Sequence, residues 1–235
     1  MKILHLYHDL MNLYGEYGNV VCLKKHLEDQ GIEVVLERKS IGDTYNICDY
    51  DFIYCGSGLE SNLKVAIKDL AKHKDELIKA IEDNKYILFT GNAMEMLGDR
   101  VDDEEALGIV KLNSKTVTKR YTGDVIVTSN EFGELVGFIN KSTLIEQDEK
   151  IGLFNYIFKD ANLNDGSLFE GYKLNNLIGT HIIGPILVKN PRLMKYYVEG
   201  IGKSNKDDFI YQDVEYPYEE ESYEVTLNAL KERIK

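Results

Sequence analysis

The stretch Tyr86-Ile-Leu-Phe-Thr-Gly-Asn-Ala-Met-Glu-Met-Leu-Gly98 decides the fold. An apolar run ends in small residues and passes at once into a helix-compatible segment, which is the pattern of a strand-to-helix elbow. Such an elbow exposes one side chain at the carboxyl edge of a parallel sheet. The turn offers only Gly91 and Asn92, and neither is a nucleophile. Taken alone, this turn is more typical of plain α/β architecture than of a catalytic site.

The residues before the elbow alternate short β-branched runs with longer periodic segments, which predicts βα units and a mostly parallel sheet. We expect strands at residues 2–7, 33–37, 51–55 and 85–90. Between the first two, Val20, Leu23 and Leu27 recur at helical spacing, and Gly31 closes the segment as a C-terminal cap. A second apolar stripe over residues 63–81 predicts another helix, broken at most once.

The residues after the elbow change character. Short β-rich runs at 108–112, 116–118, 125–128 and 135–139, separated by polar turns, predict antiparallel strands. A final strand pair is expected near 151–158 and 177–183. Helices should follow Asn190 and Ser222, with residues 202–208 as a solvated connection between them. These patterns predict an α/β three-layer sandwich, with a mostly parallel central sheet and an antiparallel extension, in one domain spanning residues 1–235.

The composition excludes several classes of protein. The net charge of −12 over 235 residues argues against a nucleic-acid partner, because phosphate binding requires a dense field of Lys and Arg. No signal-type apolar region and no apolar stretch of 18 residues occur, so we expect a cytoplasmic protein without a membrane span. The three cysteines, Cys22, Cys48 and Cys55, are too irregularly spaced for disulfides or a zinc motif. We therefore expect reduced thiols, no metal and no cofactor.

Two further motifs make the elbow specific. The first is Leu6-Tyr-His-Asp-Leu-Met-Asn-Leu-Tyr-Gly-Glu-Tyr-Gly-Asn19, and the second is Ile178-Gly-Thr-His-Ile-Ile-Gly-Pro-Ile-Leu-Val-Lys-Asn-Pro191. With the elbow, they resemble the cobyric-acid-synthase-like class I glutamine amidotransferases, most closely the glutaminase subunits of lipid II isoglutaminyl synthases. The resemblance covers nearly the whole chain.

The resemblance also shows what the chain lacks. Gly91 stands where the family has its nucleophilic cysteine, and Ile183 stands where it has its histidine. Asn92 and Ala93 replace two glycines, and Glu95 replaces a glutamine. Residues 139–143 replace a basic, glycine-rich run, so a further histidine and arginine are missing. The resemblance therefore implies a site near Gly56, Gly91 and Ile183 that does not hydrolyse glutamine by the family's mechanism.

Two nearby residues offer an alternative pair. Cys55 ends a strand just before Gly56-Ser57-Gly58, a turn that resembles the family's oxyanion-side glycine loop. His181 precedes Ile183 by two residues, so on an extended strand it shares that face at a displacement of about 6–7 Å. That displacement exceeds hydrogen-bond reach to position 91. A relocated Cys55–His181 dyad is therefore the minority hypothesis.

The other polar candidates have structural explanations. Gly56, Ser57, Gly58, Asn92 and His181 form the expected ligand pocket. His5 and His8 fit a core-edge and a loop histidine rather than a metal pair. We expect His26 and His73 to be solvated on helices. The acidic run at residues 213–224 is expected to be a solvated face, with a basic partner as the alternative.

Three functional hypotheses follow. The leading one is a catalytically degenerate amidotransferase-like subunit, which binds a Mur-ligase-like partner or a small ligand such as glutamine, glutamate or an anion. The resemblance implies a setting in peptidoglycan amidation. The first rival is an active glutaminase subunit that supplies ammonia to such a ligase through Cys55 and His181. The second rival is a scaffold that binds a partner and no ligand.

Overall fold

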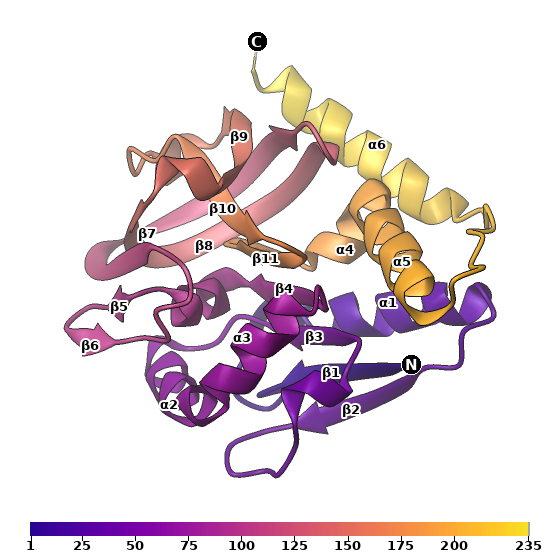
Figure 1. Cartoon of the computed structure of the whole chain (residues 1–235). Coiled ribbons are helices and arrows are strands. Elements are labelled where there is room, and N and C mark those ends of the chain that lie inside the picture. Colours follow the sequence, from indigo (N-terminus) through magenta and orange to yellow (C-terminus); the bar gives the residue numbers. More distant parts are fainter. Residues whose placement is uncertain (235) are drawn as a thin grey trace.

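The structure is a computed structural model that describes residues 1–234, the Glu149 side chain excepted (Figure 1). The predicted single domain ends at Lys235, which lies outside the described residues. One mixed sheet runs through the molecule in the order β12-β8-β7-β9-β10-β11-β4-β3-β1-β2. Two short strands, β5 (Arg100–Val101) and β6 (Glu104–Glu105), extend it beside β7.

The first half of the chain builds a parallel sheet, as predicted. Neighbouring strands in the order β11-β4-β3-β1-β2 all pair in parallel. These strands are β1 (Lys2–Leu6), β2 (Val35–Lys39), β3 (Phe52–Cys55), β4 (Tyr86–Thr90) and β11 (Leu177–Thr180). The predicted strand positions are confirmed, except that β2 lies two residues later than expected.

Helices cover both faces of this parallel sheet, which gives the three predicted layers. Successive side chains of a strand point to opposite faces. Leu4 and Ile53 accordingly belong to the core under α2 (Glu60–Leu70) and α3 (Lys74–Glu82). Ile3 and Phe52 belong to the opposite core, under α1 (Gly18–Asp29), α4 (Ile186–Lys189) and α5 (Pro191–Asn205). The 3₁₀ turn η3 (Ala71–His73) separates α2 from α3, so the helix expected over residues 63–81 is broken once.

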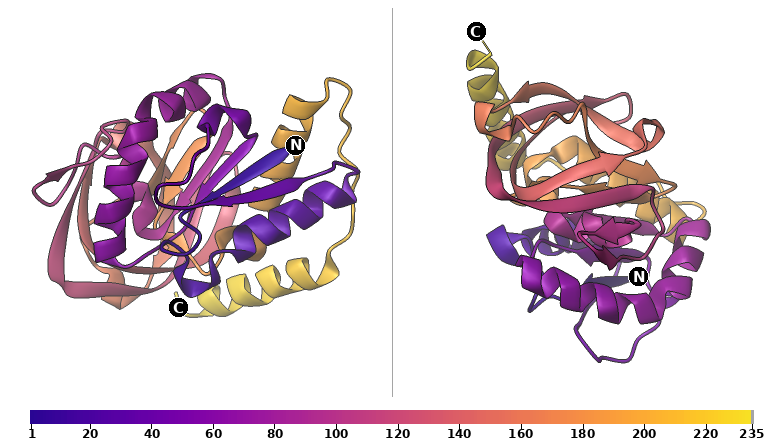
Figure 2. Two further views of the ribbon diagram at one scale, coloured as in Figure 1. Left: turned by 90° about the horizontal axis from the view of Figure 1, so that it is seen from below. Right: turned by 90° about the vertical axis from the view of Figure 1, so that its left-hand side faces the viewer.

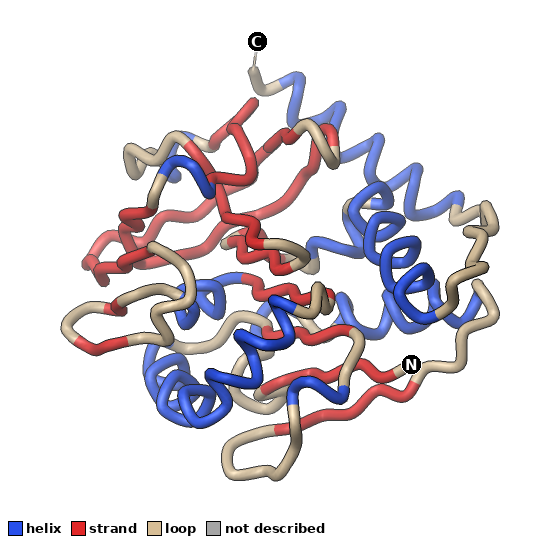
Figure 3. Tube along the Cα trace, in the orientation of Figure 1, coloured by secondary structure: helices blue, strands red, loops and turns tan. Residues whose placement is uncertain are grey.

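The second half of the chain builds an antiparallel layer of long strands (Figure 3). Its strands are β7 (Leu112–Ser129), β8 (Gly133–Gln147), β9 (Gly152–Lys159), β10 (Phe169–Leu174) and β12 (Ile182–Ile183). The last helix, α6 (Pro217–Glu232), packs Tyr223, Leu227 and Leu230 against Ile126 and Val136 of β7 and β8. Both the antiparallel extension and the helix that ends the chain were predicted.

Several predicted boundaries in this half are wrong. Residues 116–118 and 125–128 belong to one strand, β7, whose register shifts between Thr116 and Tyr121. Of residues 108–112, only Leu112 is in a strand. β10 was not predicted, and it separates β9 from β11. Residues 202–205 form the last turn of α5, and α6 begins at Pro217 rather than after Ser222.

Short helical turns make most of the remaining connections. They are η1 (Leu13–Gly15), η2 (Ile47–Asp49), η4 (Gly91–Leu97), η5 (Glu149–Ile151) and η6 (Ala161–Leu163). Within residues 1–234, none of the helices combines the length and the apolar character needed to cross a bilayer.

Candidate functional site

The predicted elbow lies at the carboxyl end of β4. Thr90 is extended, and Gly91 then turns the chain into η4 with a φ of +59°. A positive φ costs a non-glycine residue about 1–2 kcal/mol, and catalytic elbows hold their nucleophile in a strained turn of this kind. The backbone of a nucleophile elbow is therefore present. The helix-compatible segment that follows it is a 3₁₀ helix.

Ser57 and Ile183 fill the space in front of Gly91. A Cβ atom built on Gly91 would overlap the Ser57 Cβ, lie 2.5 Å from its Oγ and lie 3.2 Å from the Ile183 Cγ2. Real Cβ atoms do not approach other atoms as closely as this Oγ. The positions of nucleophile and base thus converge, as the resemblance implies. They hold a hydrogen and an alkyl group, and a serine side chain occupies the intervening volume.

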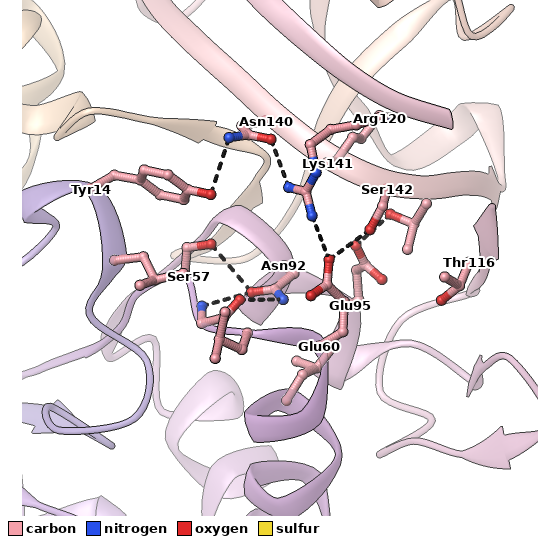
Figure 4. Close-up of a pocket in the computed structure, with 15 residues that line it drawn as sticks. Tyr14, Ser57, Glu60, Asn92, Glu95, Thr116, Arg120, Asn140, Lys141 and Ser142 are labelled. Atoms are coloured by element: carbon pink, nitrogen blue, oxygen red, sulfur yellow. Dashed lines mark hydrogen bonds and ion pairs between the residues drawn. The ribbon is translucent and has the colours of Figure 1, made fainter. Parts of the chain in front are cut away.

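Asn92 fastens the predicted glycine loop to the elbow (Figure 4). Its Oδ1 accepts hydrogen bonds from the Gly58 backbone N–H (2.9 Å) and from the Ser57 Oγ (3.3 Å), while its Nδ2 donates to the Gly58 carbonyl (2.9 Å). The backbone N–H of Gly58, a residue of the expected ligand pocket, is therefore bound to Asn92. At Gly56, an added Cβ would lie 2.9 Å from the Met11 carbonyl oxygen, so this residue is packed rather than open.

The cavity beside the elbow is small. Ser57, Gly58 and Asn92 line it, together with Glu95 from η4, and its volume is about 40 Å³. Sites for small organic ligands have volumes of roughly 300–1,000 Å³, whereas one water molecule needs about 10–15 Å³. The cavity accommodates water and excludes an amino acid.

A chain of hydrogen bonds joins other residues that line this cavity (Figure 4). Arg120 donates to Asn140 (2.8 Å) and to Glu60 (3.0 Å), and Ser142 donates to the same Glu60 oxygen (2.7 Å). Asn140 also donates to the hydroxyl of Tyr14 at 3.1 Å. Asn140 and Ser142 belong to the segment that lacks the family's histidine and arginine. Arg120 on β7 and Lys141 on β8 are the cations among the described residues that line this cavity, and sequence reasoning missed Arg120.

Glu16 supports the elbow from below. Its carboxylate accepts hydrogen bonds from the Thr90 hydroxyl, the Tyr54 hydroxyl (3.0 Å) and the Gly184 backbone N–H (2.9 Å). Burial raises the pKa of Glu16 above its usual value. This one side chain therefore joins β3, β4 and the turn after β12. Sequence reasoning missed its role, although it lies in the quoted motif at residues 6–19.

His181 lies in a break between β11 and β12, and the premise of one extended strand from 177 to 183 was wrong. β11 pairs with β4, whereas β12 pairs with β8. The imidazole is only 2% exposed. Its Nε2 lies 3.1 Å from Glu95 Oε1, and its backbone N–H donates to Glu170 Oε1 at 2.6 Å. His181 is therefore held between two buried glutamates.

His181 and Glu170 stabilise one another as an ion pair. Burial alone would lower the pKa of His181, but its hydrogen bonds to Glu170 and Glu95 raise the pKa above 6.5. Burial alone would raise the pKa of Glu170, but His181 lowers it. The two shifts agree on a charged imidazolium next to a carboxylate. A protonated ring has no lone pair with which to act as a general base.

His181 lines a second, larger cavity rather than the one at the elbow. This cavity has a volume of about 240 Å³ and is also lined by Glu170, Ser167 and Lys141. Lys141 is buried and forms a 2.7 Å ion pair with Asp165. Burial works against ionisation of Asp165, yet Lys141 holds its pKa well below the usual range. The expected pocket is therefore divided between two cavities.

Cys55 is a core residue. It is fully buried in the cluster under α2 and α3, and the one hydrogen bond of its thiol, at 3.9 Å, goes to the Gly56 carbonyl. Burial raises the pKa of the thiol far above its usual range, so the reactive thiolate is disfavoured. The partners of Cys55 and of His181 differ, and the geometry offers no dyad.

Of the predictions made for other histidines, one is confirmed and two are wrong. His5 is buried at the core edge as predicted, and burial lowers its pKa to about 4. The prediction that His26 and His73 are solvated is wrong. His73 stacks on Tyr45 at a centroid distance of 4.3 Å. His26 is buried, because α6 packs on it from the far end of the chain.

Comparison with known proteins agrees with these motifs. Residues 2–191 match the CobB/CobQ-like glutamine amidotransferase domain. The subunit GatD of the glutamine-hydrolysing lipid II isoglutaminyl synthase from Staphylococcus aureus is 33% identical over 206 residues, covering 85% of this chain and 83% of that protein. Its Streptococcus pneumoniae counterpart is 28% identical, covering 82% and 77%.

Solved structures show the same fold at low sequence identity. PurLQS from Thermotoga maritima matches with a TM-score of 0.55 and 15% identity, covering 85% of this chain and 97% of that one. The glutaminase domain of a Trypanosoma brucei CTPS, solved with acivicin, matches with a TM-score of 0.56 and 9% identity, covering 92% and 98%. The arrangement of the sheet is therefore that of class I glutamine amidotransferases.

Proposed function

The chain belongs to the CobB/CobQ-like glutamine amidotransferase family, and from this membership we propose that it is a cytoplasmic subunit without glutaminase activity that binds a Mur-type ligase. Its relatives are named as subunits of lipid II isoglutaminyl synthases. The proposed setting is therefore the amidation of peptidoglycan precursors, in which an active homologue would pass ammonia from glutamine to the ligase.

The single observation that carries this proposal is the side-chain content of the elbow. Amide hydrolysis by covalent catalysis needs a nucleophile on the turn and a base within hydrogen-bond reach. Ile183 offers the Gly91 position only a methyl group, and Ser57 fills the space between them. The Ser57 hydroxyl donates to Asn92, an amide oxygen that cannot accept a proton for catalysis. The elbow thus has the backbone turn of a catalytic site, but it has neither the nucleophile nor the base.

If the chain binds a small ligand, the proposed place is the second cavity. At about 40 Å³, the elbow cavity has no room for glutamine or glutamate. The cavity lined by His181 and Lys141 has about 240 Å³, just below the roughly 300 Å³ at which sites for small organic ligands begin. A thermal-shift screen with glutamine, glutamate and phosphate tests it, because a ligand that binds only the native state raises stability by RT ln(1 + [L]/Kd). A shift that Lys141→Met abolishes would support binding there. No shift with any of them would leave the scaffold hypothesis.

Partner binding is tested by co-expression with a Mur-type ligase of the lipid II isoglutaminyl synthase kind. We expect the two chains to co-purify as a stoichiometric complex. The complex should release no ammonia from glutamine, while an active GatD complex assayed in parallel should do so. Failure to co-purify would contradict the proposed partner. Ammonia release that Cys55→Ser abolishes would support the active rival instead.

The proposed loss of glutaminase activity is tested by restoring the family's cysteine and histidine. Gly91→Cys with Ile183→His returns the two family residues, but the new cysteine would collide with Ser57. We therefore expect the triple variant with Ser57→Gly to react with acivicin at residue 91, and the double variant to react at least about tenfold more slowly. Equal reaction of the two variants would contradict the role given to Ser57.

A further inference from the structure

A second cluster of reactive side chains lies far along the chain from the elbow motif, where the first and last helices meet. Cys22 and His26 are four residues apart on α1, so both side chains lie on one face of that helix. Glu219, in the first turn of α6, lies against them. In the left view of Figure 2, α1 (indigo) and α6 (yellow) both lie at the lower right, and Glu219 joins the first turn of α6 to α1. Neither the elbow nor the two cavities use these residues.

Two of the three distances between the ligand atoms are close to those of a tetrahedral metal site. Cys22 Sγ lies 3.7 Å from Glu219 Oε1, and His26 Nε2 lies 3.1 Å from the same oxygen. All three ligand atoms lie within 4.8 Å of one another. Zinc bonds of about 2.3 Å to sulfur and about 2.0–2.1 Å to nitrogen and oxygen place neighbouring ligand atoms roughly 3.3–3.6 Å apart. The cluster needs little adjustment to hold such an ion.

The surroundings of the cluster also favour a cation. The second carboxylate oxygen of Glu219 is buried, and it has no hydrogen-bond partner among the described residues. His26 is 5% exposed, and the ring of Tyr216 stacks on it at a centroid distance of 3.8 Å. The Tyr216 hydroxyl is anchored to Asp29 at 2.8 Å. A buried carboxylate oxygen without a donor is costly unless something positive binds it.

We propose that Cys22, His26 and Glu219 bind a borderline-soft divalent cation of the Zn²⁺ class, with water as the fourth ligand, and so join α6 to α1. Thiolate and imidazole ligands select zinc over Mg²⁺ and Ca²⁺, which prefer oxygen. Binding replaces the proton of the Cys22 thiol with a metal–sulfur bond and releases that proton to solvent. One thiolate and one carboxylate then balance the two charges of the ion, which suits a half-buried site.

The proposed metal ion would hold α6 in place. α6 covers β7 and β8 through Tyr223, Leu227 and Leu230. A metal at the first turn of α6 would fix the end of the helix that these apolar contacts do not reach. Metal binding would therefore stabilise the C-terminal helix on the rest of the molecule without acting on the elbow.

Cobalt titration of the chelator-treated full chain tests the proposal. We expect one equivalent of Co²⁺ to bind with the near-ultraviolet absorption of a cobalt–thiolate bond, and Zn²⁺ to displace it. Cys22→Ser should abolish that absorption. His26→Gln and Glu219→Gln should weaken binding at least about 10–100-fold, because losing even a residue that only hydrogen-bonds to a metal ligand has an effect of this size. Mg²⁺ should not compete.

Cys48→Ser and His73→Gln are the matched controls. Cys48 is also a half-buried thiol, and its Sγ donates to the Glu76 carbonyl, while His73 Nδ1 lies 3.3 Å from the Glu76 carboxylate. Both controls should bind cobalt as the wild type does. If cobalt-loaded wild type lacks the thiolate absorption, the proposal is overturned. This result does not depend on whether the variants fold. Absorption that survives Cys22→Ser would also overturn it.

Discussion

The elbow at Gly91 and the cluster around His181 are two neighbouring regions that differ in opposite ways in backbone shape and in reactive side chains. At the elbow, the backbone retains the turn of a catalytic site, but its side chains are a hydrogen, a hydroxymethyl and an alkyl group. Around His181, an imidazole and two glutamates are present, but they are buried and bound to one another. The elbow therefore has the backbone shape of a catalytic site without reactive side chains, whereas the His181 cluster has ionisable side chains without that backbone shape.

The largest expected effect comes from breaking the His181 cluster. Glu170→Ala removes one of the two carboxylates beside the His181 imidazolium, and it leaves the His181 backbone N–H and the Thr180 hydroxyl without their acceptor. Removing one member of a buried ion pair costs about 3–5 kcal/mol, so we expect a loss of this size in the free energy of unfolding by urea. Tyr156→Phe, which removes one 3.2 Å hydrogen bond to Glu170, should cost only about 1 kcal/mol. Equal losses would mean that the cluster holds no buried charge.

The elbow should respond through packing instead. Gly91→Ala forces a Cβ into Ser57 and into a positive φ, for which we expect a loss of about 2–4 kcal/mol from strain and overpacking together. Ser57→Gly in the same chain should recover about 1–2 kcal/mol of it. A double-mutant cycle by urea unfolding measures this coupling. Additive effects of the two changes would show that Ser57 does not fill the space in front of Gly91.

The smallest expected effect is the pH dependence of the cluster. The stabilisation from Glu170, whose pKa is lowered, is present above its unfolded pKa and disappears as pH falls through its folded pKa. The stabilisation from His181, whose pKa is raised, is complete below 6.5 and disappears as pH rises through its folded pKa. The difference in Tm between the wild type and His181→Gln should therefore be largest between about pH 4.5 and 6.5 and shrink above it. A constant difference up to pH 9 would contradict the imidazolium.

The sequence predicted the elbow well because its signals are local. The apolar run of β4, the glycine and the following turn lie within thirteen residues, and the parallel strands around it each have their own apolar run. The convergence of Gly91 with Ile183 followed from the family resemblance. That Ser57 fills the space between them could not be predicted, because it depends on how the loop after β3 packs on η4.

Sequence reasoning failed where distant segments meet. β10 contains Gly171 at a φ of +67°, which interrupts the alternation expected of a strand. His181 was assigned to one continuous strand, whereas Glu95 and Glu170 hold it in a break. His26 was expected to be solvated because its partner, Glu219, is 193 residues away along the chain. Only the folded arrangement brings these residues together.

Ammonia release from glutamine by the wild-type chain, in complex with the proposed ligase partner, tests the central claim most directly. We expect a rate equal to that of the ligase alone, because the elbow has neither a thiolate nor a base. A glutamine-dependent rate above that background, carried by this chain and blocked by acivicin, would contradict the claim.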